Sequence, residues 1–147
     1  MVETRPTVPG DAKAIAAAEK AIFPDPWSEQ DILSVISTEG GICYTAVSDG
    51  AVVGYLIGRQ ISPEGEIYRI ATLPDFRRRG IAYKLLDKAI RCEREKGLES
   101  TFLEVREKNL PARRLYESYG FVEIGKRNGY YKNPSDNAII MLYEEMR

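Results

Sequence analysis

Apolar residues recur at helical spacing in four segments of the chain. Ile15, Ala18 and Ile22 follow Asp11, a residue type that is common at helix N-caps. Ser28 has the same capping character before the apolar stripe that begins at Ile32. The pattern predicts helices over residues 11–22, 28–39, 79–96 and 109–119.

Shorter apolar runs between turn residues predict strands. The Asp49-Gly50 pair suits the positive φ angles of a type I′ turn, so the runs on either side of it form a hairpin. A third run follows the turn residues around Pro63 and ends before Pro74. The predicted strands span residues 2–5, 42–47, 51–60, 66–73, 101–105, 121–125 and 138–143.

The order of these elements predicts an α/β fold, a mixed sheet with helices on both faces. The three strands between residues 42 and 73 form an antiparallel meander, whereas the helix over 79–96 is a crossover that favours parallel pairing. A length of 147 residues fits one domain at the usual roughly 100–200 residues each. We therefore expect a single domain over residues 1–147.

Composition narrows the possible chemistry. The chain has no histidine, which excludes Ser-His-Asp and Cys-His nucleophile systems and His-ligated metal sites, and we expect no metal. The net charge of -1 gives no overall basic field, so we expect no direct binding of nucleic acid. Proton transfer must use carboxylate, Tyr, Lys, Cys or backbone groups.

The N-terminus and the cysteines indicate a cytoplasmic protein. Cys43 and Cys92 lack the spacing of a zinc site or a disulfide framework, which suits a reducing compartment. The N-terminus has no apolar segment for export. Asp49-Gly50 divides the longest apolar stretch, residues 40–58, into two strand-sized pieces, so we expect no membrane span.

A run of arginines lies where a predicted strand has ended and a long helix begins. Residues 77–82 read Arg-Arg-Arg-Gly-Ile-Ala, and the free N–H groups of a helix start would face the same space as the positive end of its dipole. Gly80 lets the backbone approach a phosphate without a Cβ, and the arginines add bidentate donors. A solvated charge cluster is the alternative, but the strand-to-helix context favours a pyrophosphate site.

Glu104 is a candidate general base. It alternates with Phe102 and Arg106 on one face of a strand that we expect near the centre of the sheet. Burying a carboxylate is costly unless it is solvated or paired. Glu104 is therefore either an ion-pair partner of Arg106 or of a helix arginine, or a base whose pKa is raised by partial desolvation.

Tyr116 is a candidate general acid. It shares a helical stripe with Ala112, Leu115 and Tyr119, which is typical of a core aromatic. Its hydroxyl offers another role, because a phenol of pKa about 10 can act as a general acid. Asn109 is first of all an N-cap.

These motifs resemble a known family. The pattern Arg77-x-x-Gly80-x-Ala82 is similar to the Q/R-x-x-G-x-G/A signature of the GNAT superfamily of N-acetyltransferases, and the order of elements resembles the GNAT acyl-CoA N-acyltransferase fold. The resemblance implies acetyl-CoA as donor, CoA as product, and a pantetheine arm paired with the third strand of the meander like an added strand. The cofactor-binding residues that it implies are Ile70, Ala71, Thr72, Arg77, Arg78, Arg79, Gly80, Ile81, Ala82, Tyr83 and Asn109.

Further motifs narrow the resemblance to GNAT enzymes of bacteria that acetylate the N-terminal alanine of a small-subunit ribosomal protein. These motifs are Leu103-Glu104-Val105-Arg106-x-x-Asn109, Leu115-Tyr116-Glu117-x-x-Gly120-Phe121, Pro26-Trp27-Ser28, Asn128-x-Tyr130-Tyr131 and the segment 136–141. The resemblance implies direct acetyl transfer, with Glu104 as base and Tyr116 as acid. The implied partner is the N-terminus of that ribosomal protein, and the implied substrate-binding residues are Trp27, Ser28, Tyr130 and Tyr131.

Two other functions stay open at this point. A GNAT enzyme of the same fold could act on lysine side chains or on small-molecule amines. Other protein substrates are also possible partners. A non-catalytic CoA-binding module would need neither Glu104 nor Tyr116. Trp27 has an alternative role as well, which is to hold the two N-terminal helices together.

Overall fold

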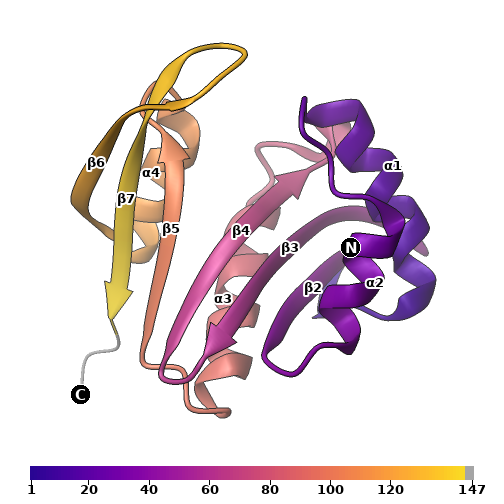
Figure 1. The fold of residues 1–147 in the computed structure, drawn as a ribbon. Coiled ribbons are helices and arrows are strands. Elements are labelled where there is room, and N and C mark those ends of the chain that lie inside the picture. The colour runs from indigo at the N-terminus through magenta and orange to yellow at the C-terminus, as the bar shows by residue number, and fades with distance from the viewer. Residues whose placement is uncertain (145–147) are drawn as a thin grey trace.

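The computed structural model describes residues 1–144, in which helices cover a seven-stranded sheet (Figure 1). The strands are β1 (Val2–Pro6), β2 (Gly41–Ser48), β3 (Ala51–Ile61), β4 (Glu64–Thr72), β5 (Ser100–Arg106), β6 (Val122–Tyr131) and β7 (Asp136–Glu144). The helices are α1 (Ala12–Ile22), α2 (Glu29–Ser37), α3 (Ile81–Arg94) and α4 (Leu110–Tyr119), with short 3-10 helices η1 (Pro9–Asp11) and η2 (Pro74–Phe76). No helix within residues 1–144 is long and apolar enough to cross a membrane.

The mixed α/β sheet that the sequence predicts is confirmed. Its strand order is β1-β2-β3-β4-β5-β7-β6, and β4 and β5, which α3 connects, are its parallel pair. Hydrophobic clusters lie on the two faces. Leu85 of α3 and Tyr116 of α4 belong to one cluster, and Ile15 of α1 and Ile32 of α2 belong to the other.

Strands β4 and β5 pair only at their beginnings and then diverge. The parallel pairing runs from Glu64 opposite Ser100 to Ile67 opposite Leu103. Beyond it, β4 stays paired with β3 and β5 stays paired with β7 (Figure 1). In the described part of the chain, the later residues of β4 therefore have no strand partner on the β5 side.

A bulge in β4 lies just after this divergence begins. Ile67 is opposite Gly58 of β3 and Arg69 is opposite Ile57, so Tyr68 has no opposite residue on β3. A bulge bends a strand and redirects its side chains. Tyr68 is 44% exposed as a result of its position outside the core.

The hydrogen bonds at the starts of α1 and α2 agree only in part with the N-caps that the sequence predicts. Ser28 Oγ accepts a hydrogen bond from Asp31 N (3.0 Å) and Asp31 Oδ2 accepts one from Ser28 N (3.0 Å), a capping box that starts α2. Asp11 precedes α1 as expected, but its carboxylate accepts hydrogen bonds from Val8 N and from Arg5 instead of capping the helix.

Two element boundaries differ from the sequence prediction for backbone reasons. Helix α3 begins at Ile81 and not near Arg79, because Arg78 (φ 65°) and Gly80 (φ 75°) both have left-handed conformations that a right-handed helix cannot continue through. Strand β6 extends to Tyr131, well past residue 125, because its later part pairs with β7 after a register shift.

Candidate active site

The arginine segment forms a turn at the start of α3. Gly80 is the N-cap residue, and a Cβ built on it would meet no atom within 4 Å, so this side of the turn is open. The first intrahelical bond joins Lys84 N to Gly80 O (3.1 Å), which leaves the N–H groups of Ile81, Ala82 and Tyr83 without helical acceptors. The open turn and these N–H groups fit a phosphate group.

The three arginines of this turn do not all have the same role. Arg77 Nε donates to the carbonyl oxygen of Thr72 (3.1 Å), which fixes the turn to the end of β4. The Arg79 guanidinium lies over the Phe76 ring, 5.0 Å from its centroid. The predicted positive charge is therefore present, but two of the three side chains also have structural contacts.

Ile70, Ala71 and Thr72 lie on the part of β4 that diverges from β5. On their other side they pair with Leu56, Tyr55 and Gly54 of β3. Their edge toward β5 lies beyond the four residue pairs of the parallel ladder. An extended chain that carries amide groups fits such an edge in the way that an added strand does.

Glu104 lies on β5 just beyond the last pair of that ladder. Its side chain is 19% exposed, and its Oε2 lies 3.2 Å from Arg127 Nε of β6. The two groups are not oriented for a hydrogen bond, so Glu104 Oε2 is buried and accepts no hydrogen bond. The ion-pair partner is thus Arg127 and not Arg106 or a helix arginine, as the alternative assignment expected.

Arg106 instead holds the end of the β6–β7 hairpin. Its guanidinium donates to the carbonyl oxygens of Pro134 (2.6 Å) and Lys132 (2.9 Å) and lies over the Tyr131 ring, 4.4 Å from its centroid. These contacts use the donors that would otherwise pair with Glu104 on the same strand. Arg106 therefore positions Tyr131.

Electrostatic interactions link Glu104 with Tyr131 and Tyr131 with Tyr116. Burial and the negative charge of Glu104 raise the pKa of Tyr131 to about 12. Burial and the nearby Tyr131 raise the pKa of Tyr116 above its ordinary value. Both phenols stay protonated at neutral pH, so both can donate a proton or a hydrogen bond. Tyr116 also packs in the core, tilted against the Phe121 ring at 5.8 Å, so the core role expected for its stripe is present as well.

The remaining predicted residues occupy two sides of this region. Trp27 stacks on Tyr68 of β4 with ring centroids 6.0 Å apart, and Tyr130 and Tyr131 are in edge contact at 5.1 Å on β6. Ser28 is the N-cap of α2. Asn109 is the N-cap of α4, where its Oδ1 accepts from Ala112 N (3.2 Å). The sequence did not identify Tyr68, because an exposed aromatic on a strand gives no signal of a bulge.

A buried carboxylate that the sequence did not identify holds Trp27 in place. Glu19 of α1 is 0% exposed. Its Oε1 accepts from Trp27 N and from Arg69 Nε, both at 3.0 Å, and its Oε2 accepts from the Tyr55 hydroxyl at 2.5 Å. The hydrogen bond to Glu19 and burial both raise the pKa of Tyr55, so its hydroxyl keeps the proton that it donates.

Arg69 extends this network to the segment between α1 and α2. Its NH2 group donates to Asp25 O (2.7 Å), and its guanidinium lies 3.8 Å from the centroid of the Phe23 ring. Arg69 follows the bulged Tyr68 on β4. Residues 23–28 are therefore attached to the bulged strand by one buried ion pair and its hydrogen bonds.

Comparison with known proteins identifies the family. The family described as Acetyltransferase (GNAT) matches residues 12–121. The chain belongs to this family. It is an acetyl-CoA-dependent N-acetyltransferase, as the resemblance to the GNAT superfamily implied, and this sets aside the non-catalytic module.

Several GNAT relatives are similar over most of the chain. The [Ribosomal protein bS18]-alanine N-acetyltransferase of Haemophilus ducreyi is 31% identical over 145 residues, which are 96% of this chain and 97% of the relative. The protein of the same name from Escherichia coli is 32% identical over 89% of each chain. The homologue from Haemophilus influenzae is 38% identical over 65% of this chain and 66% of its own length.

Solved GNAT structures show the same fold. The crystal structure of the ribosomal-protein-S18-alanine N-acetyltransferase from Escherichia coli matches with a TM-score of 0.90 and 29% identity, over 100% of this chain and 96% of that one. Arabidopsis thaliana NAA60 in complex with acetyl-CoA, at 20% identity and a TM-score of 0.85 over 99% of this chain and 100% of that one, shares the fold.

Proposed function

We propose that this GNAT enzyme transfers the acetyl group of acetyl-CoA to the N-terminal alanine of ribosomal protein bS18. The names of the relatives that cover most of the chain support this substrate. The observation that carries the chemistry is Glu104, a partly buried carboxylate with an oxygen that lacks a hydrogen-bond donor, placed where β4 and β5 separate. Tyr131 is close enough to Glu104 for the carboxylate charge to raise its pKa, and Tyr116 is the proposed acid of the same site.

Two segments are suited to hold the cofactor. The N–H groups at the start of α3 and the charges of Arg77, Arg78 and Arg79 would bind its pyrophosphate. The unpaired edge of residues 70–72 on β4 would hydrogen-bond its amide-bearing arm. When bound there, acetyl-CoA supplies an activated thioester. A backbone N–H of the same edge is suited to stabilise the oxyanion that develops on the thioester carbonyl.

Glu104 is proposed to take a proton from the α-ammonium of the substrate, directly or through a water. The pKa of an α-amine is about 8 and that of lysine is about 10.4, so deprotonating the α-amine costs about 3 kcal/mol less at the same pH. A carboxylate base is adequate for this smaller cost. The neutral amine then attacks the thioester without a covalent enzyme intermediate.

Tyr116 is proposed to donate its proton to the departing thiolate. Burial keeps this phenol protonated at neutral pH. The transfer to a thiolate, whose conjugate acid has a pKa of about 8.5, is uphill, and burial of the phenol makes it more so, so the same poorly solvated site must also disfavour the charged thiolate. Asn109, at the start of the helix that carries Tyr116, is the additional cofactor contact.

Four residues are proposed to hold the substrate peptide. Trp27, supported by Tyr68, forms one wall, and Tyr130 and Tyr131 form the other. Aromatic side chains provide large contact surfaces at low cost in conformational entropy. Ser28, whose side chain caps α2, would act on the peptide through the position of the loop that it closes.

Mass spectrometry with synthetic peptides tests this proposal. A peptide that begins with the alanine of bS18 should gain roughly 42 daltons, the mass of one acetyl group, in the presence of acetyl-CoA. The same peptide with a blocked N-terminus should gain nothing, even if it contains lysine. Acetylation of the blocked peptide would assign the enzyme to lysine side chains, and acetylation of neither peptide would exclude bS18 as substrate.

A further inference from the structure

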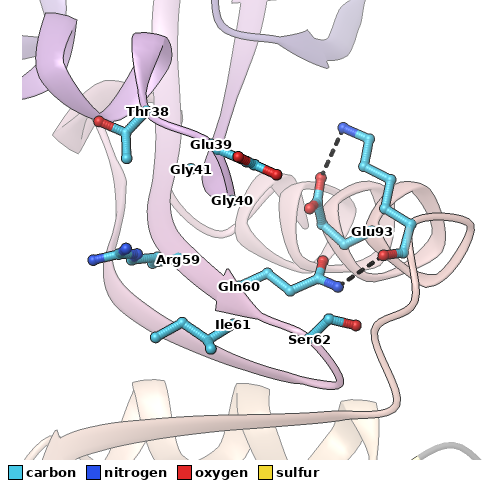
Figure 2. A pocket seen from close by; sticks show the side chains of 10 residues that line it. Thr38, Glu39, Gly40, Gly41, Arg59, Gln60, Ile61, Ser62 and Glu93 are labelled. Atoms are coloured by element: carbon cyan, nitrogen blue, oxygen red, sulfur yellow. Dashed lines mark hydrogen bonds and ion pairs between the residues drawn. The ribbon is translucent and has the colours of Figure 1, made fainter.

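A cavity of about 620 Å³ lies at the opposite end of α3 from the arginine turn (Figure 2). It is an open cleft lined by the α2–β2 connection, the end of β3 and the C-terminal end of α3. Helix α3 has 14 residues, so its ends are roughly 20 Å apart at about 1.5 Å per residue. The cavity is therefore separate from the acetyl-transfer site, and its volume lies in the roughly 300–1,000 Å³ range of small-molecule sites.

Gln60, which lines this cavity, has an unused hydrogen-bond acceptor. The residue is 8% exposed, and its Nε2 donates to the carbonyl oxygen of Lys96 (3.0 Å). Because a carbonyl oxygen only accepts, this bond fixes which end of the amide faces Lys96. The other end, Oε1, is buried and has no hydrogen-bond partner. A buried acceptor in this state favours a ligand that donates.

Glu93 adds a negative charge next to this acceptor. It is 3% exposed, and its Oε2 accepts from the Tyr44 hydroxyl (2.7 Å) and pairs with Lys96 Nζ (3.4 Å). It lies in the last turn of α3, where the negative end of the helix dipole also favours a cation. Figure 2 shows Glu39, an exposed residue of the α2–β2 connection, extending toward the side of the cavity where Glu93 lies.

The cations of the cavity are at its solvent side. The Lys96 side chain is 66% exposed. The Arg59 side chain is exposed and extends away from Gln60 and Glu93 in Figure 2. The buried part of the cavity is therefore lined by acceptors, and an amine ligand would compete with the exposed Lys96 ammonium for the Glu93 carboxylate.

We propose that this cavity binds the primary ammonium group of an alkylamine. The ammonium has three donors, and it would give hydrogen bonds to Gln60 Oε1 and to the Glu93 carboxylate. Glu39 is the carboxylate that a second ammonium of a diamine would meet. Two sources share this chemistry, a free linear amine and a lysine side chain of another protein.

Titration of the 15N-labelled full chain, followed by NMR, tests this binding. The probes are butane-1,4-diamine for the free amine and Nα-acetyl-lysine methylamide for the lysine side chain, with butan-1-ol as the neutral control. We expect saturable shifts at the side-chain amide of Gln60 and at the backbone amides of Lys96 and Gly97, but not at residues 70–72. Binding of either amine supports the proposal, and the tighter of the two identifies the source.

A variant and a matched control test the role of Gln60. Gln60→Met keeps the length of the side chain and removes the acceptor, so the tighter probe should bind at least about tenfold more weakly. Glu117→Gln removes an exposed carboxylate from α4 and should leave binding unchanged. If the Gln60→Met variant does not fold, the positions of the NMR shifts in the natural chain test the proposal. The proposal is overturned if neither amine gives saturable shifts, if the shifts lie at residues 70–72 instead, or if a folded Gln60→Met variant binds normally.

Discussion

Glu104 is distinguished from the two fully buried glutamates by its hydrogen bonds. Glu19 and Glu93 each accept a hydrogen bond from a tyrosine hydroxyl, at 2.5 and 2.7 Å. Glu104 Oε2 has only the charge of Arg127 nearby and no donor. A carboxylate oxygen that accepts no hydrogen bond can take up a proton without first losing one, although protonation also weakens its ion pair with Arg127, and this suits a base more than a structural anchor.

Glu104→Gln should lower kcat by about 10²–10⁴-fold, the usual contribution of a general base. The loss should be largest below about pH 8, where more of the substrate α-amine is protonated. The Kd for acetyl-CoA should not change, because Glu104 does not belong to the proposed cofactor contacts. Steady-state rates from pH 6 to 9 and calorimetry of acetyl-CoA binding give the two readouts, and a rate that is the same as that of the natural chain at every pH would remove Glu104 from the mechanism.

Tyr116→Phe should lower kcat and leave the KM of the peptide nearly unchanged. In the proposed mechanism the protonated phenol is the active form, so activity should be retained below its pKa and lost as the pH rises through it. Burial raises that pKa above the ordinary value of about 10, and the rate of the natural enzyme should therefore show no loss from Tyr116 up to about pH 10. A Phe variant with the natural rate, under conditions where chemistry limits turnover, would contradict the assignment.

At the level of elements, the α1–α2 segment and the bulged strand β4 act as one unit. Arg69 is 14% exposed on its side chain and pairs with the fully buried Glu19, which also receives the backbone N–H of Trp27. Removing one member of a buried ion pair leaves an uncompensated charge. The position of Trp27 over Tyr68 should thus depend on Arg69 through the Glu19 carboxylate, which binds both Arg69 and the backbone N–H of Trp27.

Arg69→Met should destabilise the protein by about 3 kcal/mol and raise the KM of the peptide, with the Kd of acetyl-CoA unchanged. Arg91→Met is the matched control, since Arg91 is 70% exposed in its pair with Asp87 and its loss should cost at most about 1 kcal/mol. Denaturant unfolding and peptide kinetics measure both effects. Adding Glu19→Gln to Arg69→Met should recover part of the lost stability, and equal losses for Arg69→Met and Arg91→Met would argue against the network.

The features that sequence analysis predicted are local ones. The capping box of Ser28 and the Asp49-Gly50 hairpin depend on residues close together in the chain. The contact of Arg69 with Glu19 joins residues 50 positions apart, and the Arg127–Glu104 pair joins two strands that are not neighbours in the sheet. Neither pair has a spacing that a sequence pattern detects, and the same is true of the bulge at Tyr68.

For the whole molecule, the sheet that separates the two hydrophobic clusters is continuous. Leu56 and Ile57 are adjacent on β3 and belong to different clusters. Unfolding of either cluster would therefore disrupt a strand on which the other cluster also depends. We propose on this ground that residues 1–147 unfold as one domain.

Trp27, the single tryptophan, should report the same transition as the whole backbone. It packs against the cluster of α1 and α2, so its fluorescence follows that side of the sheet, whereas far-UV circular dichroism follows all elements. The two signals should give one shared midpoint in urea. Separate midpoints would show that the α1–α2 side unfolds independently.

Because the ladder between β4 and β5 is short, bound acetyl-CoA should also help to hold the two parts of the sheet together. Within residues 1–144, four residue pairs of the parallel ladder join strands β1–β4 to strands β5–β7. A bound acyl carrier that bridges the wider end would fasten the halves to each other and shield the amide hydrogens of residues 70–72 from solvent. Hydrogen–deuterium exchange at those amides should slow when acetyl-CoA is added, because the bound substrate would also stabilise the sheet of the enzyme that consumes it.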